Sequence, residues 1–181
     1  MKMEVRTLQG VEQIIDAMAV TEKAARKVAV RALNDTAKWF KSNAGKEIAK
    51  ETGVPSAFVK KRFFITKAVA QELDSPLCAT ISVNLYDVRP PHLGALQKTS
   101  SGAKAGKFTF GGAFIATMNK KRGPSLYKRK GKELFPVSEM GVDIKTKAEP
   151  ILERLVNEAP AVYEKRFQSQ MNYEASKGNA L

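Results

Sequence analysis

Small and apolar side chains recur every three or four residues between residues 22 and 52, which is the spacing of one helix face. The stripe consists of Ala25, Ala29, Ala32, Thr36, Phe40, Ala44 and Ile48, widened by Val28 and Leu33. Gly53 and Pro55 follow, and both residue types end helices. We therefore predict a long helix over residues 22–52, whose alanine-rich face lets another element approach closely.

Shorter patterns flank this helix on both sides. Apolar positions within residues 11–18 have helical spacing, and Thr21 is a candidate N-cap for the long helix. Pro55 can open a short helix, after which the aromatic and β-branched residues 63–65 favour a strand. The N-terminal third is therefore predicted to be mainly helical.

Strand signals dominate the middle of the chain. Apolar and polar residues alternate from residue 77 to 86, which is the clearest strand pattern in the sequence. Residues 108–118 predict another strand, bent at the glycine pair 111–112. Residues 125–130 and 134–140 predict a hairpin.

A last helix is predicted to begin at Glu149-Pro150. Its apolar face continues to Met171, and Pro160 is expected to kink or break it. We expect residues 172–181 to fray.

This order of elements predicts an α+β fold. We expect the long N-terminal helix and the C-terminal helix to pack on a mostly antiparallel sheet of about four to five strands. The chain is long enough for one core, so residues 1–181 are predicted to form a single domain. Its expected parts are an N-terminal helical part 8–62, a β part 63–145 with mobile basic loops 98–107 and 119–132, and a C-terminal helix 148–171.

Positive charge is concentrated in the β part. Lys and Arg number 31 against 18 Asp and Glu, which gives a net charge of +13. Between Asp87 and Glu133 there is no acid, but there are eleven cations: Arg89, Lys98, Lys104, Lys107, Lys120, Lys121, Arg122, Lys128, Arg129, Lys130 and Lys132. Charges this dense repel one another, which favours an acidic partner, although a solvated flexible loop would also accommodate them. The candidate contact residues are Lys120, Lys121, Arg122, Lys128, Arg129 and Lys130.

The sequence gives little support to catalysis or metal binding. Cys78 and His92 are the only cysteine and histidine, so an internal disulfide and a cysteine-cluster zinc site are excluded. Neither a nucleophile elbow nor a P-loop motif is present. We expect no enzymatic activity, no cofactor and no metal. The absence of a long apolar run and of a signal-peptide pattern predicts a soluble, unsecreted protein.

Residues 48–62 resemble a helix-turn-helix, with Ala49, Gly53 and Val59 at the small, turn and apolar positions. In that alternative the chain is a sequence-specific DNA-binding protein. Its phosphate contacts would come from Lys60, Lys61 and Arg62. Two features oppose it, because the upstream helix is long and strand-forming residues 63–66 follow at once.

The pattern as a whole resembles the phage minor tail protein Z family, the lambdoid tail-completion proteins. The resemblance is carried in order by residues 8–13, the alanine-rich 30–37, 48–54 with the basic 59–62, 112–115, 134–137 and 144–151. It is loosest between residues 68 and 106.

This resemblance implies a virion structural protein without enzymatic activity, acting in tail completion and head–tail joining near the DNA end. The implied partners are other tail or neck proteins and further copies of the chain in a ring, such as a hexamer. Contact with phage DNA would be non-specific, and no membrane is involved. The implied location is the virion tail, after assembly in the host cytoplasm.

Overall fold

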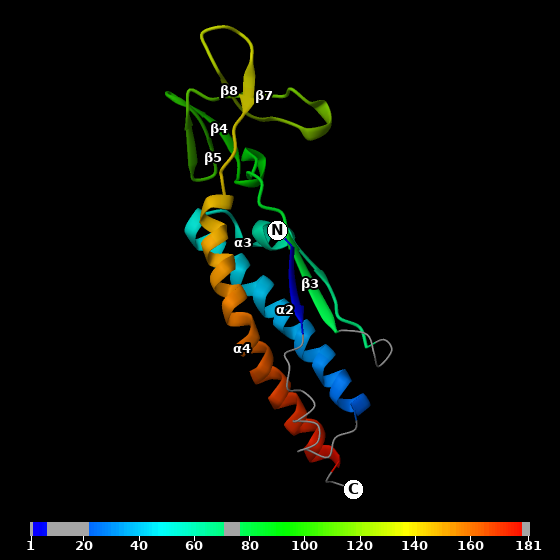
Figure 1. Cartoon of the computed structure of the whole chain (residues 1–181). Helices are drawn as coiled ribbons and strands as arrows, with labels where there is room; N and C mark the ends of the chain where they lie inside the picture. The colour runs from blue at the N-terminus through cyan, green and yellow to red at the C-terminus, as the bar shows by residue number, and fades with distance from the viewer. Residues whose placement is uncertain (1, 7–21, 71–76, 179–181) are drawn as a thin grey trace.

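The computed structural model describes residues 2–6, 22–70 and 77–178. It confirms the α+β class, with two long helices and three small antiparallel sheets. The elements form an elongated molecule, with the helices in one half and most of the strands at the far end (Figure 1). The predicted helix within residues 11–18 and the cap at Thr21 lie outside the described residues.

Helix α2 (Glu22–Thr52) has the predicted bounds. All nine residues of its predicted stripe are at most 2% exposed. Gly53 has a φ of 73° and donates its amide to the Ala49 carbonyl at 2.8 Å. This left-handed conformation favours glycine, so the sequence signal for the helix end is confirmed.

Helix α4 (Lys145–Gly178) is longer than predicted at both ends. It begins earlier because Asp143 caps it, accepting from the Lys145 amide at 2.8 Å and the Thr146 hydroxyl at 2.6 Å. These hydrogen bonds lower the pKa of the Asp143 carboxyl.

Pro160 was expected to kink or break the last helix, and α4 does not break there, since the helix runs through this residue. Its neighbours Ala159 and Tyr163 are buried, and their packing compensates for the amide hydrogen bond that proline lacks. The predicted fraying of residues 172–181 is contradicted for residues 172–178, which are helical, while residues 179–181 lie outside the described residues. An ion pair of 3.0 Å between Arg31 of α2 and Glu174 holds this last part against α2.

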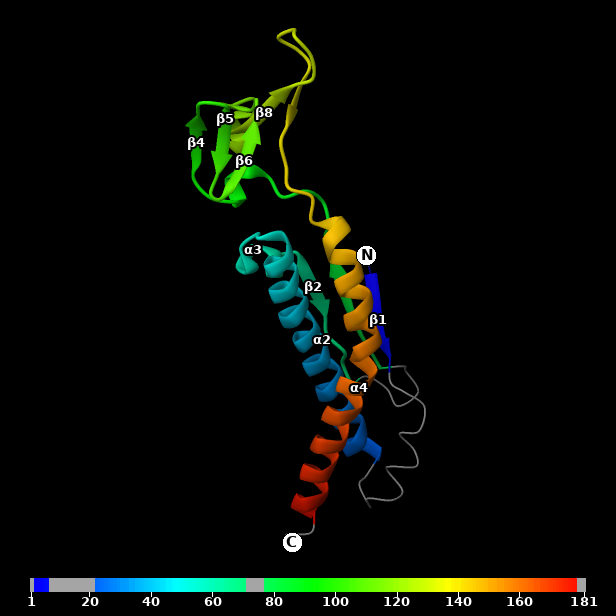
Figure 2. The same ribbon diagram turned by 90° about the vertical axis from the view of Figure 1, so that its left-hand side faces the viewer.

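Helix α2 lies between α4 and a three-stranded sheet. The helices run antiparallel, side by side in both views (Figures 1 and 2). The sheet has the order β1-β3-β2, with β1 (Lys2–Arg6), β2 (Phe63–Thr66) and β3 (Cys78–Val83) antiparallel. Strand β3 alternates as predicted, burying Ala79, Ile81 and Val83. Polar and apolar residues also alternate over β1, but no strand was predicted there.

The other strands form two further sheets at the far end, rather than extending a single sheet. One contains β4 (Leu96–Thr99), β5 (Gly102–Ala105) and β6 (Phe108–Gly111), and the other contains β7 (Phe114–Ala116), β8 (Ser125–Arg129) and β9 (Val137–Glu139). The predicted continuous strand 108–118 is divided because Gly112 turns the chain with a φ of 70°.

Residues 98–107 were predicted to form a mobile loop, but most of them lie in strands β4 and β5. These residues form part of the β4-β5-β6 meander, in which Ala103 and Ala105 are fully buried. Their small side chains and the neighbouring glycines resemble a flexible linker in sequence, but they also permit tight turns between short strands. Within the predicted loop 119–132, residues 120–122 form the 3-10 turn η2 and residues 125–129 form β8.

The far end is joined to the helical half by two adjacent chain segments. Val88 and Val142 exchange backbone hydrogen bonds of 2.9 and 3.0 Å. We call residues 88–142 the distal β region. The chain enters and leaves this region side by side, so its insertion leaves the packing of α2 on α4 intact.

Candidate functional site

The distal β region presents most of its cations without counter-charges. Arg89 pairs with Glu139, its Nε lying 2.8 Å from the Glu139 Oε1. In the part of the chain that the structure describes, no carboxylate pairs with the other ten cations of this region. Nine of these ten are exposed, namely Lys98, Lys107, Lys120, Lys121, Arg122, Lys128, Arg129, Lys130 and Lys132.

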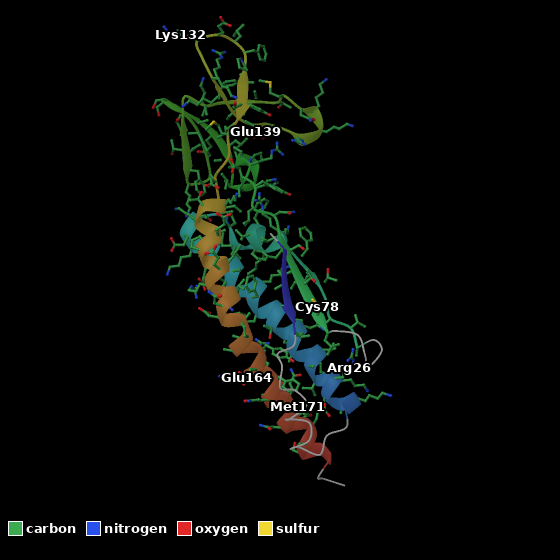
Figure 3. All side chains as sticks on the ribbon, viewed as in Figure 1. Arg26, Cys78, Lys132, Glu139, Glu164 and Met171 are labelled. Atoms are coloured by element: carbon green, nitrogen blue, oxygen red, sulfur yellow. The ribbon has the colours of Figure 1, made fainter. Side chains whose placement is uncertain are left out.

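The six candidate residues in this region fall into two groups. Lys120, Lys121 and Arg122 form the 3-10 turn η2, which Asn119 caps by accepting from the Lys121 amide at 2.9 Å. The segment 128–130 spans the end of β8 and the start of the loop that leads to β9. Figure 3 places Lys132 of this loop at one extremity of the molecule, while Met171 lies near the other.

Aromatic and glycine residues position the cations at the end of β8. The Arg129 guanidinium lies 5.6 Å from the ring centroid of Phe114, a cation–π distance. A Cβ at Gly112 would lie 3.6 Å from the Lys128 Cε, so the Lys128 side chain passes over this glycine. Both side chains lie along the surface here and remain exposed.

Two large apolar side chains are exposed within the same basic surface. Leu134 and Phe135 are each 69% exposed. The hairpin formed by β8 and β9 confirms the predicted pairing, but β9 covers only residues 137–139. Leu134 and Phe135 therefore lie in the connecting loop, although the sequence placed them in a strand. Their apolar character was visible in the sequence, but their exposure was not.

The candidate DNA-contact residues near α3 (Ser56–Lys61) have different environments. Lys61 is exposed, and Lys60 is half-buried against Gly45, where a Cβ would lie 2.4 Å from the Lys60 Cγ. Arg62 is only 9% exposed. The three cations therefore do not form one open surface.

Arg62 instead connects the helical half to the distal β region. Its guanidinium donates to the backbone carbonyls of Tyr86 and Asp87, the latter at 3.2 Å. It also lies 4.8 Å from the Phe58 ring centroid and 4.9 Å from that of Tyr86. Burial lowers the pKa of Arg62, while Tyr86 and Asp87 oppose this shift. With α3 only six residues long and Arg62 engaged here, the geometry does not favour a helix-turn-helix.

His92 belongs to the same junction. Its ring stacks on Phe58, with centroids 4.6 Å apart. The pKa of His92 is lowered, first by partial burial and then by Arg89 and Arg62, while Glu139 acts in the opposite direction. The lowered pKa favours the uncharged form of the His92 ring, which stacks on Phe58.

The described residues suggest neither a metal centre nor a membrane span. Across residues 2–6, 22–70 and 77–178, no three His, Cys, Asp or Glu side chains are grouped so as to hold a metal ion. Within the same ranges, no helix has the length and apolar character needed to cross a bilayer. Its exposed cations make the distal β region the surface that we consider for function.

Replacing Arg62 with alanine is expected to lower the free energy of unfolding by about 2 kcal/mol, because two carbonyls lose their donor and two rings lose the guanidinium. The matched control is Lys61→Ala, which removes an exposed cation and should change stability by less than about 0.5 kcal/mol. Urea unfolding monitored by circular dichroism measures the free energy of unfolding of both variants. Equal stability of the two variants would contradict the structural role of Arg62.

Acidification is expected to destabilise the protein through His92. Because the folded pKa lies below the unfolded value of about 6.5, the unfolded chain binds the proton more readily. This contribution to stability is present above about pH 6.5 and is lost as the pH falls through the folded pKa. His92→Phe keeps a ring against Phe58 and should reduce the fall in melting temperature between about pH 7.5 and 5.5. As His92 is the only histidine, an unchanged pH dependence would exclude this mechanism.

Comparison with known proteins agrees with the resemblance found in the sequence. The family model described as prophage minor tail protein Z (GPZ) matches residues 8–178, nearly the whole chain. Neither the curated proteins nor the solved structures gave a significant match. The match includes both long helices and the distal β region. The chain thus belongs to the prophage minor tail protein Z family, whose members are structural proteins of phage tails.

Proposed function

We propose that the chain acts in tail completion and in the joining of the tail to the head. In this proposal the distal β region docks on an acidic surface, either of a neighbouring tail or neck protein or of the DNA end. The observation that carries the proposal is the set of ten cations in this region without carboxylate partners among the described residues.

The distribution of ion pairs supports this assignment of the docking surface. In the helical half, several cations are neutralised by carboxylates on the same or the neighbouring helix. Examples are Arg31 with Glu174, and Arg154 with both Glu47 and Glu158. The unpaired cations of the distal β region repel one another in the isolated subunit. An acidic partner would reduce this electrostatic repulsion.

Charge reversal in the basic segment tests the docking surface. The triple variant Lys128→Glu, Arg129→Glu, Lys130→Glu is expected to block the joining of tails to heads, because attraction to an acidic surface becomes repulsion. All three side chains are exposed, so the subunit should remain folded, as circular dichroism can verify. Infectious particles formed by complementation are the readout.

A matched control reverses three exposed lysines in the helical half, Lys46, Lys67 and Lys165. This variant has the same change in net charge, and it is expected to complement like the wild type. Normal joining by the variant with reversals at residues 128–130 would contradict the proposed docking surface.

We further propose that copies of the chain assemble into a ring, such as a hexamer. Among the described strands, β1 and β2 each pair only with β3, so the outer edge of each has no strand partner within this part of the chain. Edge strands supply unpaired backbone donors and acceptors, which a neighbouring copy can use.

Light scattering at two salt concentrations, with and without a short DNA duplex, tests this assembly. We expect the mass of a ring, or of a monomer awaiting its tail partners, with duplex binding that is absent or lost at moderate salt. A dimer that holds one duplex through moderate salt would contradict the proposal and favour the sequence-specific DNA-binding alternative.

A further inference from the structure

Leu134 and Phe135 form an apolar projection at the extremity of the distal β region. Each is 69% exposed, and they are the most exposed large hydrophobic residues among the described part of the chain. Adjacent apolar side chains with this exposure cost solvation free energy in the isolated subunit. Such a projection is typical of a surface that is covered in a complex.

The backbone on both sides of the projection is fixed by pairing. Arg129 is opposite Val137 in the β8–β9 register, and the Lys130 amide donates to the Pro136 carbonyl at 3.1 Å. The loop between them is therefore closed at its base and carries Leu134 and Phe135 outward. Because its ends are held in place, less conformational entropy is lost when this loop binds.

The charges next to the projection indicate the chemistry of its partner. Lys128, Arg129, Lys130 and Lys132 are exposed, and Glu133 is the one acid among residues 128–136. An acidic surface matches the cations, while the apolar pair requires a pocket that excludes water. Phosphates of DNA match the cations equally well, but they leave Leu134 and Phe135 in water.

We propose that Leu134 and Phe135 insert into an apolar pocket with an acidic rim on a protein of the phage tail. The pair acts as the anchor of the contact, and the surrounding cations orient the approach. This inference rests on the proposed function, since it specifies what the distal β region docks on. Of the two partners considered for the distal β region, this inference favours a protein over the DNA end.

The probe is a preparation of tails assembled by a phage that lacks this coding sequence. Purified protein is mixed with these tails, and binding is measured by cosedimentation at low salt and at about 0.5 M salt, where exposed charges are screened. The main variant is Leu134→Ser with Phe135→Ser. Its matched control is Tyr173→Ser, which removes another exposed aromatic ring, 58% exposed, on α4 of the helical half.

We expect the serine pair to weaken tail binding at least roughly tenfold, because buried apolar anchors dominate such interfaces. The weaker tail binding of the serine pair should persist at about 0.5 M salt. Tyr173→Ser should bind like the wild type, and Leu134→Met with Phe135→Trp should restore most of the affinity. The charge-reversal variant at residues 128–130 should also bind weakly, with its largest effect at low salt.

Other outcomes separate this inference from the proposed function. If the serine pair binds tails like the wild type while the charge-reversal variant loses tail binding, Leu134 and Phe135 are not an anchor. The proposed docking of the distal β region then still holds. Wild-type binding by both variants overturns both proposals. A short DNA duplex is tested in parallel. If the serine pair loses duplex binding as strongly as tail binding, the anchor is overturned in favour of an apolar wedge between base pairs.

Discussion

The structure depends on the burial of the alanine-rich face of α2. This face packs against α4 on one side and the β1-β3-β2 sheet on the other (Figure 1). Small side chains at positions such as Ala29 and Ala32 let both neighbours approach the helix, while Phe40 and Ile48 fill the wider spaces. The helical half is therefore a rigid element of about 45 Å, at 1.5 Å per residue of α2.

The distal β region continues the hydrophobic core of this element, with buried residues such as Leu93, Ala105 and Leu126 in the same cluster. It is joined through the bridge between Val88 and Val142 and through Arg62, whose guanidinium binds the carbonyls of Tyr86 and Asp87. This arrangement keeps a dense group of like charges away from the main core, so their mutual repulsion acts mainly on the surface. A basic region of this kind can be retained in a folded subunit and neutralised on docking. It suits a structural component of a tail that gains its neighbours during assembly.

Local patterns in the sequence were sufficient wherever an element is fixed by its own residues. The bounds of α2, the left-handed Gly53, the alternation in β3 and the β8–β9 pairing were all predicted, because side-chain periodicity and turn residues determine them. The order of these local signals also carried the resemblance to the family. The errors arose where contacts between distant residues outweighed local preferences, as at Pro160 in α4 and in the β4-β5-β6 meander.

The same distinction applies to the candidate site. The sequence by itself determined the density of cations between residues 88 and 132, because charge is a property of composition. Only the tertiary structure decided which cations remain exposed and unpaired, since an ion pair such as that of Arg89 with Glu139 joins residues far apart in the chain. It also buried Arg62 beside Phe58 and Tyr86, and left Leu134 and Phe135 exposed beyond the short strand β9. Burial depends on what packs against a side chain, and no local pattern specifies that.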